Sequence, residues 1–261
     1  MRSSVALDLW TAGAAALLGG ALGSFLNVCV YRLPLSRSVV SPPSSCPSCG
    51  SRIAWFDNVP VLGWLWLGGR CRACHAPISV QYPLVEALIA GVWAAAFGWI
   101  GLGWEALAAA VFLTLLVGIA LTDVQTYIIP DEFTIGGAGI GLVLAGLRGL
   151  DALAPALLGG VVGFVLLYAV AWAGEKLFKK EAMGGGDIKM MAMVGVFVGW
   201  KGVLLTVFGG ALFGTIVFVP ITMIRPNKLV PFGVFLAMGA ALAFLAGEPI
   251  YTWYLGFLRG S

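Results

Sequence analysis

Long apolar runs recur along this chain, and their recurrence is the feature that most constrains its fold. The first run, residues 9–31, contains no charged side chain. A helix needs about 20 apolar residues to cross a hydrocarbon core of about 30 Å. The pattern predicts an all-α polytopic membrane protein with about eight transmembrane helices. The predicted spans are residues 9–31, 83–100, 104–122, 133–147, 152–173, 188–200, 202–224 and 229–246.

Composition supports a membrane protein over a soluble one. Of the 261 residues, 60% are hydrophobic and 10% are charged, whereas a soluble domain carries about 25% charged residues. The net charge of +3 is too small to indicate nucleic-acid binding. The first apolar run is longer than the core of a secretory signal, and no convincing small-residue cleavage site follows it, so we expect a retained helix.

Residues 32–82 form the one long polar stretch and separate the first span from the rest. We therefore predict three parts: a first transmembrane helix (1–31), a cytoplasmic metal-binding loop (32–82) and a seven-helix membrane domain (83–261). With the loop in the cytoplasm, eleven of the 15 Lys and Arg residues fall on the cytoplasmic side, as the positive-inside rule requires. The same orientation places Asp123 and Asp187 on the cytoplasmic side.

Four cysteines in the polar stretch have the spacing of a metal site. Cys46, Cys49, Cys71 and Cys74 form C-x2-C-x21-C-x2-C, a pattern that brings four sulfurs around Zn²⁺. Four thiolates leave no open coordination position, so we expect a structural zinc that staples the loop. A redox pair is the alternative, while a reducing cytoplasm disfavours two disulfides. The fifth cysteine, Cys29, is expected to be a buried apolar residue.

Two aspartates stand at the ends of predicted spans. Asp187 follows Gly184, Gly185 and Gly186 at the start of an apolar run, and Asp123 ends the third span. A carboxylate beside lipid is costly and is by default a functional hypothesis, although acidic residues at helix ends often simply face water. Two facing carboxylates can share one proton and act together as acid and base on a peptide bond. We therefore predict that Asp123 and Asp187 are catalytic.

Other catalytic arrangements lack their residues. The sole histidine, His75, lies in the cysteine loop, so no Ser-His-acid triad competes, and no Walker loop is present.

Four further polar residues could shape a site beside lipid, together with the three glycines. Asn27 lies in the first span, where it could also simply bond a neighbouring helix, and Glu86 begins the second. Asp131 follows Pro130 at a helix start, and Lys189 could pair with a carboxylate or extend to the interface.

These residues give the chain a resemblance to the type IV prepilin peptidases. Gly184–Asp187 resembles the G-x-G-D motif of that aspartic protease family, and Asp123 corresponds to its other aspartate. The likeness also covers the two cysteine pairs and residues 23–34, 57–60, 82–86 and 231–237.

The resemblance implies a substrate and a place in the cell. It implies that prepilins or pseudopilins are cut after a glycine at the cytoplasmic face of a bacterial inner membrane, in type IV pilus or type II secretion systems. It further implies N-methylation of the new terminus from S-adenosylmethionine, although the segment before Cys46 is shorter here than in many Gram-negative members.

Three other functions fit parts of the pattern. A preflagellin-type or signal-peptide peptidase would share the G-x-G-D logic, but the cysteine loop and residues 23–34 favour the prepilin branch. A proton-coupled transporter would use the two aspartates as proton carriers, yet both lie at one face and no inverted repeat is evident. A non-catalytic scaffold would explain the cysteines but not the glycines beside Asp187.

Overall fold

A computed structural model describes residues 9–180, 183–224 and 231–258 of the chain. Four basic residues used to orient the protein, Arg2, Arg225, Lys228 and Arg259, lie outside these ranges, as does the start of the predicted eighth span. Within the described ranges the chain is helical and has no β-strand. The only β-type pairing in these ranges consists of two isolated antiparallel bridges, which join Ser45 to Arg52 and Arg70 to Pro77.

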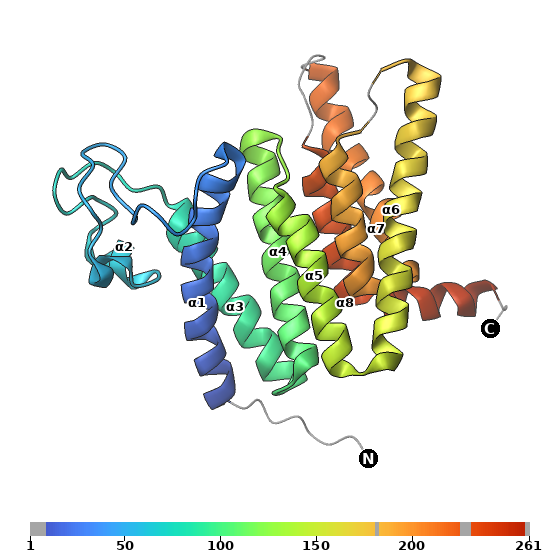
Figure 1. Ribbon diagram of the computed structural model, residues 1–261, viewed down its shortest axis with the longest axis horizontal. Helices are drawn as coiled ribbons and strands as arrows, with labels where there is room; N and C mark the ends of the chain where they lie inside the picture. Colours follow the sequence, from blue (N-terminus) through green and yellow to red (C-terminus); the bar gives the residue numbers. More distant parts are fainter. Residues whose placement is uncertain (1–8, 181–182, 225–230, 259–261) are drawn as a thin grey trace. The chain divides into compact units, whose positions relative to one another are not determined.

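Seven long helices and three short ones make up the described fold (Figure 1). The long helices are α1 (Leu9–Arg32), α3 (Gln81–Ile100), α4 (Trp104–Thr126), α5 (Asp131–Arg148), α6 (Leu150–Phe178), α7 (Gly185–Ile224) and α8 (Phe232–Leu258). The short ones are η1 (Leu33–Leu35), η2 (Trp55–Asn58) and α2 (Leu62–Trp66), and all three belong to the segment that joins α1 to α3.

The predicted all-α, multi-pass architecture is confirmed, but the count of eight spans is not. Six of the described helices are long and apolar enough to cross a membrane: α1, α3, α4, α6, α7 and α8. Helix α5 has 18 residues and carries charges at both ends. Helix α7 joins the predicted sixth and seventh spans across a break at Gly199, whose φ of 68° lies in the left-handed region that glycine adopts readily.

The chain divides into two compact units, residues 1–114 and 115–261. In the first unit α1 packs antiparallel to α3 through small residues. A Cβ at Gly19 would lie 2.7 Å from Cβ of Trp93, and one at Gly23 would lie 2.8 Å from Cα of Glu86. Such close backbone approach is typical of helix pairs in membranes. The three-part division of the chain into residues 1–31, 32–82 and 83–261 remains a prediction.

In the second unit α7 packs against α5, α6 and α8. Its first half supplies the core, where Met190, Met191 and Val194 are fully buried. Gly160 of α6 faces this helix, because a Cβ there would lie 3.0 Å from Val196. The first half of α7, which carries Asp187, is therefore closely packed in the core of this unit.

Candidate active site and metal centre

Asp187 lies in the first turn of α7, where the glycine run becomes helical. Its backbone N–H donates to the Gly184 carbonyl at 3.1 Å, which closes that turn. The residue is 9% exposed, and its Oδ1 is buried without a hydrogen-bond partner among the described residues. A buried carboxylate oxygen without a hydrogen bond is costly, so the described residues leave the Asp187 carboxylate only partly satisfied.

Asp123 lies near the end of α4 and is 5% exposed. Its Oδ2 accepts a 3.2 Å hydrogen bond from the backbone N–H of Val234, and the N–H of Gly233 also faces the carboxylate. Both amides belong to the first turn of α8, which begins at Phe232. A helix N-terminus carries unpaired N–H groups and a partial positive charge, which together favour an anion. The start of α8 therefore holds one side of Asp123.

The two aspartates come together around Ile129. A Cβ at Gly186 would lie 3.0 Å from Cβ of Ile129, and a Cβ at Gly233 would lie 2.7 Å from Cδ1 of the same side chain. The same Cβ at Gly233 would also lie 2.9 Å from Oδ2 of Asp123. Asp123 and Asp187 are near enough for direct charge repulsion. The structure thus places both predicted residues at one site, where a shared proton is the least costly arrangement.

The three glycines have different surroundings at this site. A Cβ at Gly184 would meet only Asp187 Oδ2, at 3.5 Å, and a Cβ at Gly185 would meet nothing within 4 Å. Gly186 instead packs against Ile129. The backbone beside Asp187 is therefore open at Gly184 and Gly185 and closed at Gly186.

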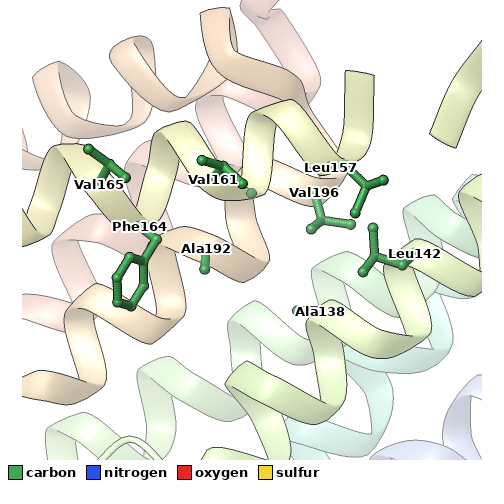
Figure 2. Close-up of a pocket in the computed structure, with 9 residues that line it drawn as sticks. Ala138, Leu142, Leu157, Val161, Phe164, Val165, Ala192 and Val196 are labelled. Carbon is green, nitrogen blue, oxygen red and sulfur yellow. The ribbon is translucent and has the colours of Figure 1, made fainter. Parts of the chain in front are cut away.

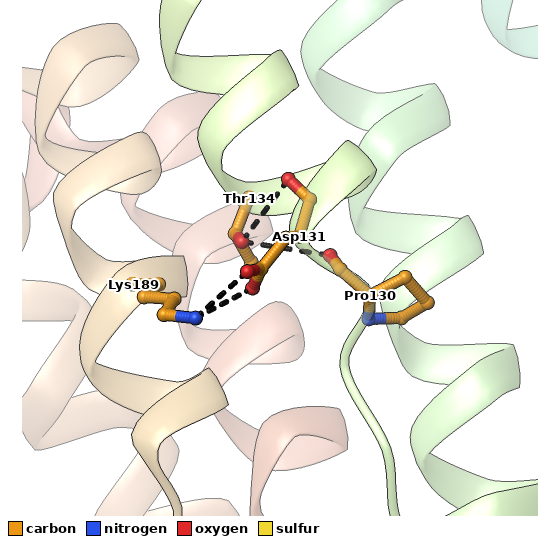
Figure 3. A network of polar contacts seen from close by, with 4 residues as sticks. All are labelled: Pro130, Asp131, Thr134 and Lys189. Carbon is orange, nitrogen blue, oxygen red and sulfur yellow. Dashed lines mark hydrogen bonds and ion pairs between the residues drawn. The ribbon is translucent and has the colours of Figure 1, made fainter. Parts of the chain in front are cut away.

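Lys189 forms an ion pair with Asp131 across the starts of α5 and α7 (Figure 3). Its Nζ lies 2.7 Å from Oδ1 and 2.8 Å from Oδ2 of Asp131, and both side chains are partly exposed. Of the two roles predicted for Lys189, the structure shows pairing with a carboxylate. The ion pair links the first turn of α5 to the first turns of α7, close in sequence to Asp187.

An apolar groove of about 310 Å³ lies between α5, α6 and α7 (Figure 2). Its lining includes Ala138 and Leu142 of α5 and Val196 of α7. Val196 follows Asp187 by nine residues, which at about 3.6 residues per turn places the two on opposite sides of α7. The groove therefore does not contain the carboxylate pair, although large apolar pockets are the usual starting point for locating a site.

Asn27 and Glu86 form a separate polar cluster in the first unit. Both are buried, at 4% and 8% exposure. Asn27 Nδ2 donates to the Tyr82 carbonyl at 3.2 Å, and Glu86 Oε2 accepts a 2.7 Å hydrogen bond from the N–H of Val61. Asn27 Oδ1 is buried without a partner among the described residues. The structure thus groups these two predicted residues with each other.

The four predicted cysteines come together in the segment between α1 and α3. Their sulfur atoms lie within 4.8 Å of one another, and Sγ of Cys46 is 3.8 Å from Sγ of Cys74. A tetrahedral zinc with Zn–S bonds of about 2.3 Å requires sulfurs about 3.8 Å apart. The cluster can therefore hold a metal ion, and its donors fit zinc.

Tight turns shape each half of this cluster. Gly50 N–H donates to the Cys46 carbonyl and His75 N–H to the Cys71 carbonyl, both at 2.9 Å. Gly50 and His75 adopt positive φ angles of 71° and 57°, so His75 is a turn residue here. The backbone amides of Cys49 and Ser48 lower the pKa of the Cys46 thiol to about 6, which favours the thiolate that binds metal.

Sequence reasoning did not identify the residues that surround the buried carboxylates Asp123, Asp187 and Glu86. Ile129, Gly233 and Val234 carry no catalytic side chain, so no chemical pattern singles them out. For Gly233 a signal existed, because it lies in one of the stretches that resemble the family. Val61 gave no signal, since its role depends on a backbone N–H and a φ of 61°.

Comparison with known proteins gives two family matches along the chain. The bacterial peptidase A24 N-terminal domain matches residues 17–100, and the type IV leader peptidase family matches residues 107–219. Together these matches cover both carboxylates, the four cysteines and the Asn27–Glu86 cluster. No solved structure matches the chain.

Several curated relatives share one printed name, prepilin leader peptidase/N-methyltransferase. The protein of Aeromonas hydrophila is 35% identical over 261 residues, which is 90% of this chain and 90% of the relative. That of Pseudomonas aeruginosa is 34% identical and covers 92% of each chain. That of Myxococcus xanthus is 41% identical over 201 residues, which is 77% of this chain and 60% of the relative's length.

Proposed function

This chain belongs to the type IV leader peptidase family, and we propose that it is a membrane aspartic endopeptidase that removes the leader from type IV prepilins or pseudopilins. The convergence of Asp123 and Asp187, two buried carboxylates brought together by α4, α7 and α8, carries the proposal. The printed names of the relatives agree with it.

The two carboxylates act as one unit in the proposed reaction. The ionised member removes a proton from water, and the water oxygen attacks the peptide carbonyl. The neutral member protonates the carbonyl oxygen, which gives a tetrahedral diol. The member that took the proton from water then passes it to the leaving amine as the C–N bond breaks. The other member recovers a proton from a diol hydroxyl as the new carboxyl group forms, so the pair returns to its starting state without a covalent intermediate. The amides of Gly233 and Val234 hold Asp123 in place during this exchange.

The open backbone at Gly184 and Gly185 is the proposed approach for the substrate. An extended peptide can pass close to Asp187 there, because no side chain and no neighbouring atom blocks the Gly185 position. We place this site at the cytoplasmic face of a bacterial inner membrane and the cut after a glycine. The excess of Lys and Arg on that side supports the orientation.

We propose N-methylation of the new terminus as a second activity, carried by the first unit. S-adenosylmethionine would supply the methyl group. Asn27 Oδ1, which lacks a partner among the described residues, and the Glu86 carboxylate are two buried acceptors. Asn27 bonds the carbonyl of Tyr82, which precedes Glu86 by about one turn of α3. Such acceptors suit the amine that receives the methyl group, because an amine is a hydrogen-bond donor. The four cysteines would hold a structural Zn²⁺ that shapes the adjoining loop.

Cleavage of a purified prepilin by the detergent-solubilised protein tests the proposal. Asp123→Asn and Asp187→Asn should each abolish cleavage while the helical circular dichroism is retained. Glu132→Gln is the matched control, because Glu132 is an exposed acid at the start of α5. Cleavage at the wild-type rate by either aspartate variant would refute the pair.

Methylation is measured separately on a product that has already been cut. Glu86→Gln and Asn27→Leu should reduce methyl incorporation and raise the KM for the cut product, with leader cleavage unchanged. A binding measurement with S-adenosylmethionine then distinguishes loss of the donor from loss of the amine site. Full methylation by both variants would remove the cluster from this role.

A further inference from the structure

Residues 53–69, here called the Trp-rich segment, lie between the two cysteine pairs and contain one charged residue, Asp57. The sequence alone places them in a polar cytoplasmic loop. Six of their large apolar side chains are nevertheless turned outward, at exposures from 39% to 85%. These side chains are Trp55, Phe56, Val59, Leu62, Leu65 and Trp66. An outward apolar patch of this kind marks an interaction surface.

The Trp-rich segment folds back along the membrane helices of the first unit. A Cβ at Gly20 of α1 would lie 3.3 Å from Cβ of Pro60 and 3.9 Å from Cβ of Ala90. Gly20 lies about 18 Å along α1 from Arg32, at about 1.5 Å per residue. Figure 1 shows α2 beside the middle of α1 and not beyond its end. Pro60 is therefore at a depth that the hydrocarbon core occupies around a spanning α1.

Glu86 fixes the segment at this depth. The Val61 N–H donates to Glu86 Oε2 at 2.7 Å, five residues into α3. Val61 adopts φ 61° and ψ −51°, a conformation that is unusual for a β-branched residue and persists only where its surroundings impose it. The buried carboxylate thus holds a strained turn beside α1 and α3.

Much of the irregular backbone on the α2 side of the segment is hydrogen-bonded within the protein. Lipid offers no hydrogen bonds, so non-helical backbone at membrane depth must be satisfied within the protein. The N–H groups that bond backbone carbonyls here include those of Leu62, Gly63, Leu65, Leu67, Gly68 and Gly69, and the N–H of Val61 is taken by Glu86.

The one charged side chain of the segment, Asp57, is also paired. Asp57 Oδ2 accepts a 2.8 Å hydrogen bond from Arg72 Nε, and the guanidinium lies 5.3 Å from the centre of the Phe56 ring. The cysteine cluster brings Cys49 and Cys71 together on either side of the segment. The two ends of the Trp-rich segment are therefore held together by the cysteine cluster. A hairpin that enters and leaves the membrane by the same face has this arrangement.

We propose that the Trp-rich segment is a re-entrant hairpin whose outer face contacts the acyl chains of the bilayer. Its tip at Pro60 lies beside α1 and α3, its base is closed by the cysteine cluster, and its exposed Trp and Leu side chains face lipid. Apolar stretches of about 10–14 residues are too short to span and are typical of such segments. The metal site would then close the base of a membrane element.

Photocrosslinking in vesicles of phosphatidylcholine and phosphatidylglycerol tests this placement. p-Benzoylphenylalanine replaces Leu62 or Trp66. Both side chains are exposed, so the replacement should not disturb folding. Irradiation should attach phospholipid through an acyl carbon, as seen by mass spectrometry. Leu17 of α1 is the lipid-facing control, and Val40, in the polar stretch before the first cysteine pair, is the aqueous control. Adducts at Leu17 with none at Leu62 and Trp66 would overturn the proposal.

A second pair of variants tests the role of Glu86 in the same vesicles. Glu86→Gln keeps an acceptor for the Val61 N–H and should leave the acyl adducts unchanged. Glu86→Leu removes that acceptor, so the adduct yield at Leu62 should fall severalfold while that at Leu17 is constant. Equal yields at Leu62 in all three proteins would overturn the assignment of Glu86 as the residue that holds the hairpin.

Discussion

The backbone N–H of Val234 donates a hydrogen bond of 3.2 Å to Oδ2 of Asp123, across 111 positions of sequence. The contact sets the first turn of α8 against the end of α4, at the point where α7 presents Asp187. Asp123 is thus held by a helix N-terminus, while Oδ1 of Asp187 has no hydrogen-bond partner among the described residues. This asymmetry gives the pair one anchored and one open member.

Gly233→Ala should damage the site through packing. The added Cβ would lie 2.9 Å from Asp123 Oδ2 and 2.7 Å from Ile129, so one of them must move. We expect cleavage to fall by about 100-fold, as for a misplacement of about 1 Å, with a stability loss of about 1–3 kcal/mol. Cleavage rates and thermal unfolding in detergent measure both effects.

The matched control for that change is Gly247→Ala on the same helix. Its Cβ would come no closer than 3.8 Å to any atom, so both stability and cleavage should be retained. If the two alanine variants cleaved equally well, the close contact at Gly233 would not matter to the reaction.

Gly185→Ala should separate substrate access from folding. No atom lies within 4 Å of the new Cβ, and alanine is favoured over glycine in a helix by up to about 1 kcal/mol. The variant should therefore be at least as stable as the parent, yet its KM for a prepilin should rise because the methyl group narrows the approach to Asp187. Gly136→Ala, also free of contacts, should leave KM unchanged. A parental KM for Gly185→Ala would place the substrate elsewhere.

The ion pair of Lys189 with Asp131 should contribute little to stability. Both side chains are partly exposed, and exposed pairs typically contribute about 0–1 kcal/mol. A double-mutant cycle of Lys189→Met and Asp131→Asn should give a coupling energy below about 1 kcal/mol that weakens with added salt. Lys189→Met should retain most of its cleavage activity, in contrast to Asp187→Asn. Complete loss of cleavage in Lys189→Met would instead indicate a role in the chemistry.

Loss of the metal should lower the stability of the loop between α1 and α3 more than it lowers the rate of leader cleavage. Metal analysis of the purified protein should find about one Zn²⁺ per chain, as expected for four cysteine ligands. Cys74→Ser should lose that zinc, become sensitive to protease between α1 and α3, and lose methylation before cleavage. Cys29→Ala is the control, because Cys29 is buried in α1 away from the cluster, and it should keep its metal. A Cys74→Ser protein with full zinc would refute the site.

Local sequence determined much of this protein. Long apolar runs must form helices in lipid because no other open structure satisfies the backbone, and each predicted run lies largely within a described helix. The spacing of the four cysteines was enough to predict their cluster, since each pair lies within one tight turn. The positions of Asp123 and Asp187 at the ends of apolar runs were enough to propose them as partners.

Tertiary structure decided what depends on contacts between distant segments. Gly199, with φ 68° and ψ 176°, breaks α7 near the boundary between the predicted sixth and seventh spans. The hydrogen bond from Val234 to Asp123 is donated by a backbone N–H. Every residue except proline carries such a group, so no sequence pattern identifies this one. The placement of the Trp-rich segment beside Gly20 depends on one carboxylate, Glu86, that accepts a bond from a strained turn. Sequence specifies which side chains are costly beside lipid, and only the folded chain shows what compensates each of them.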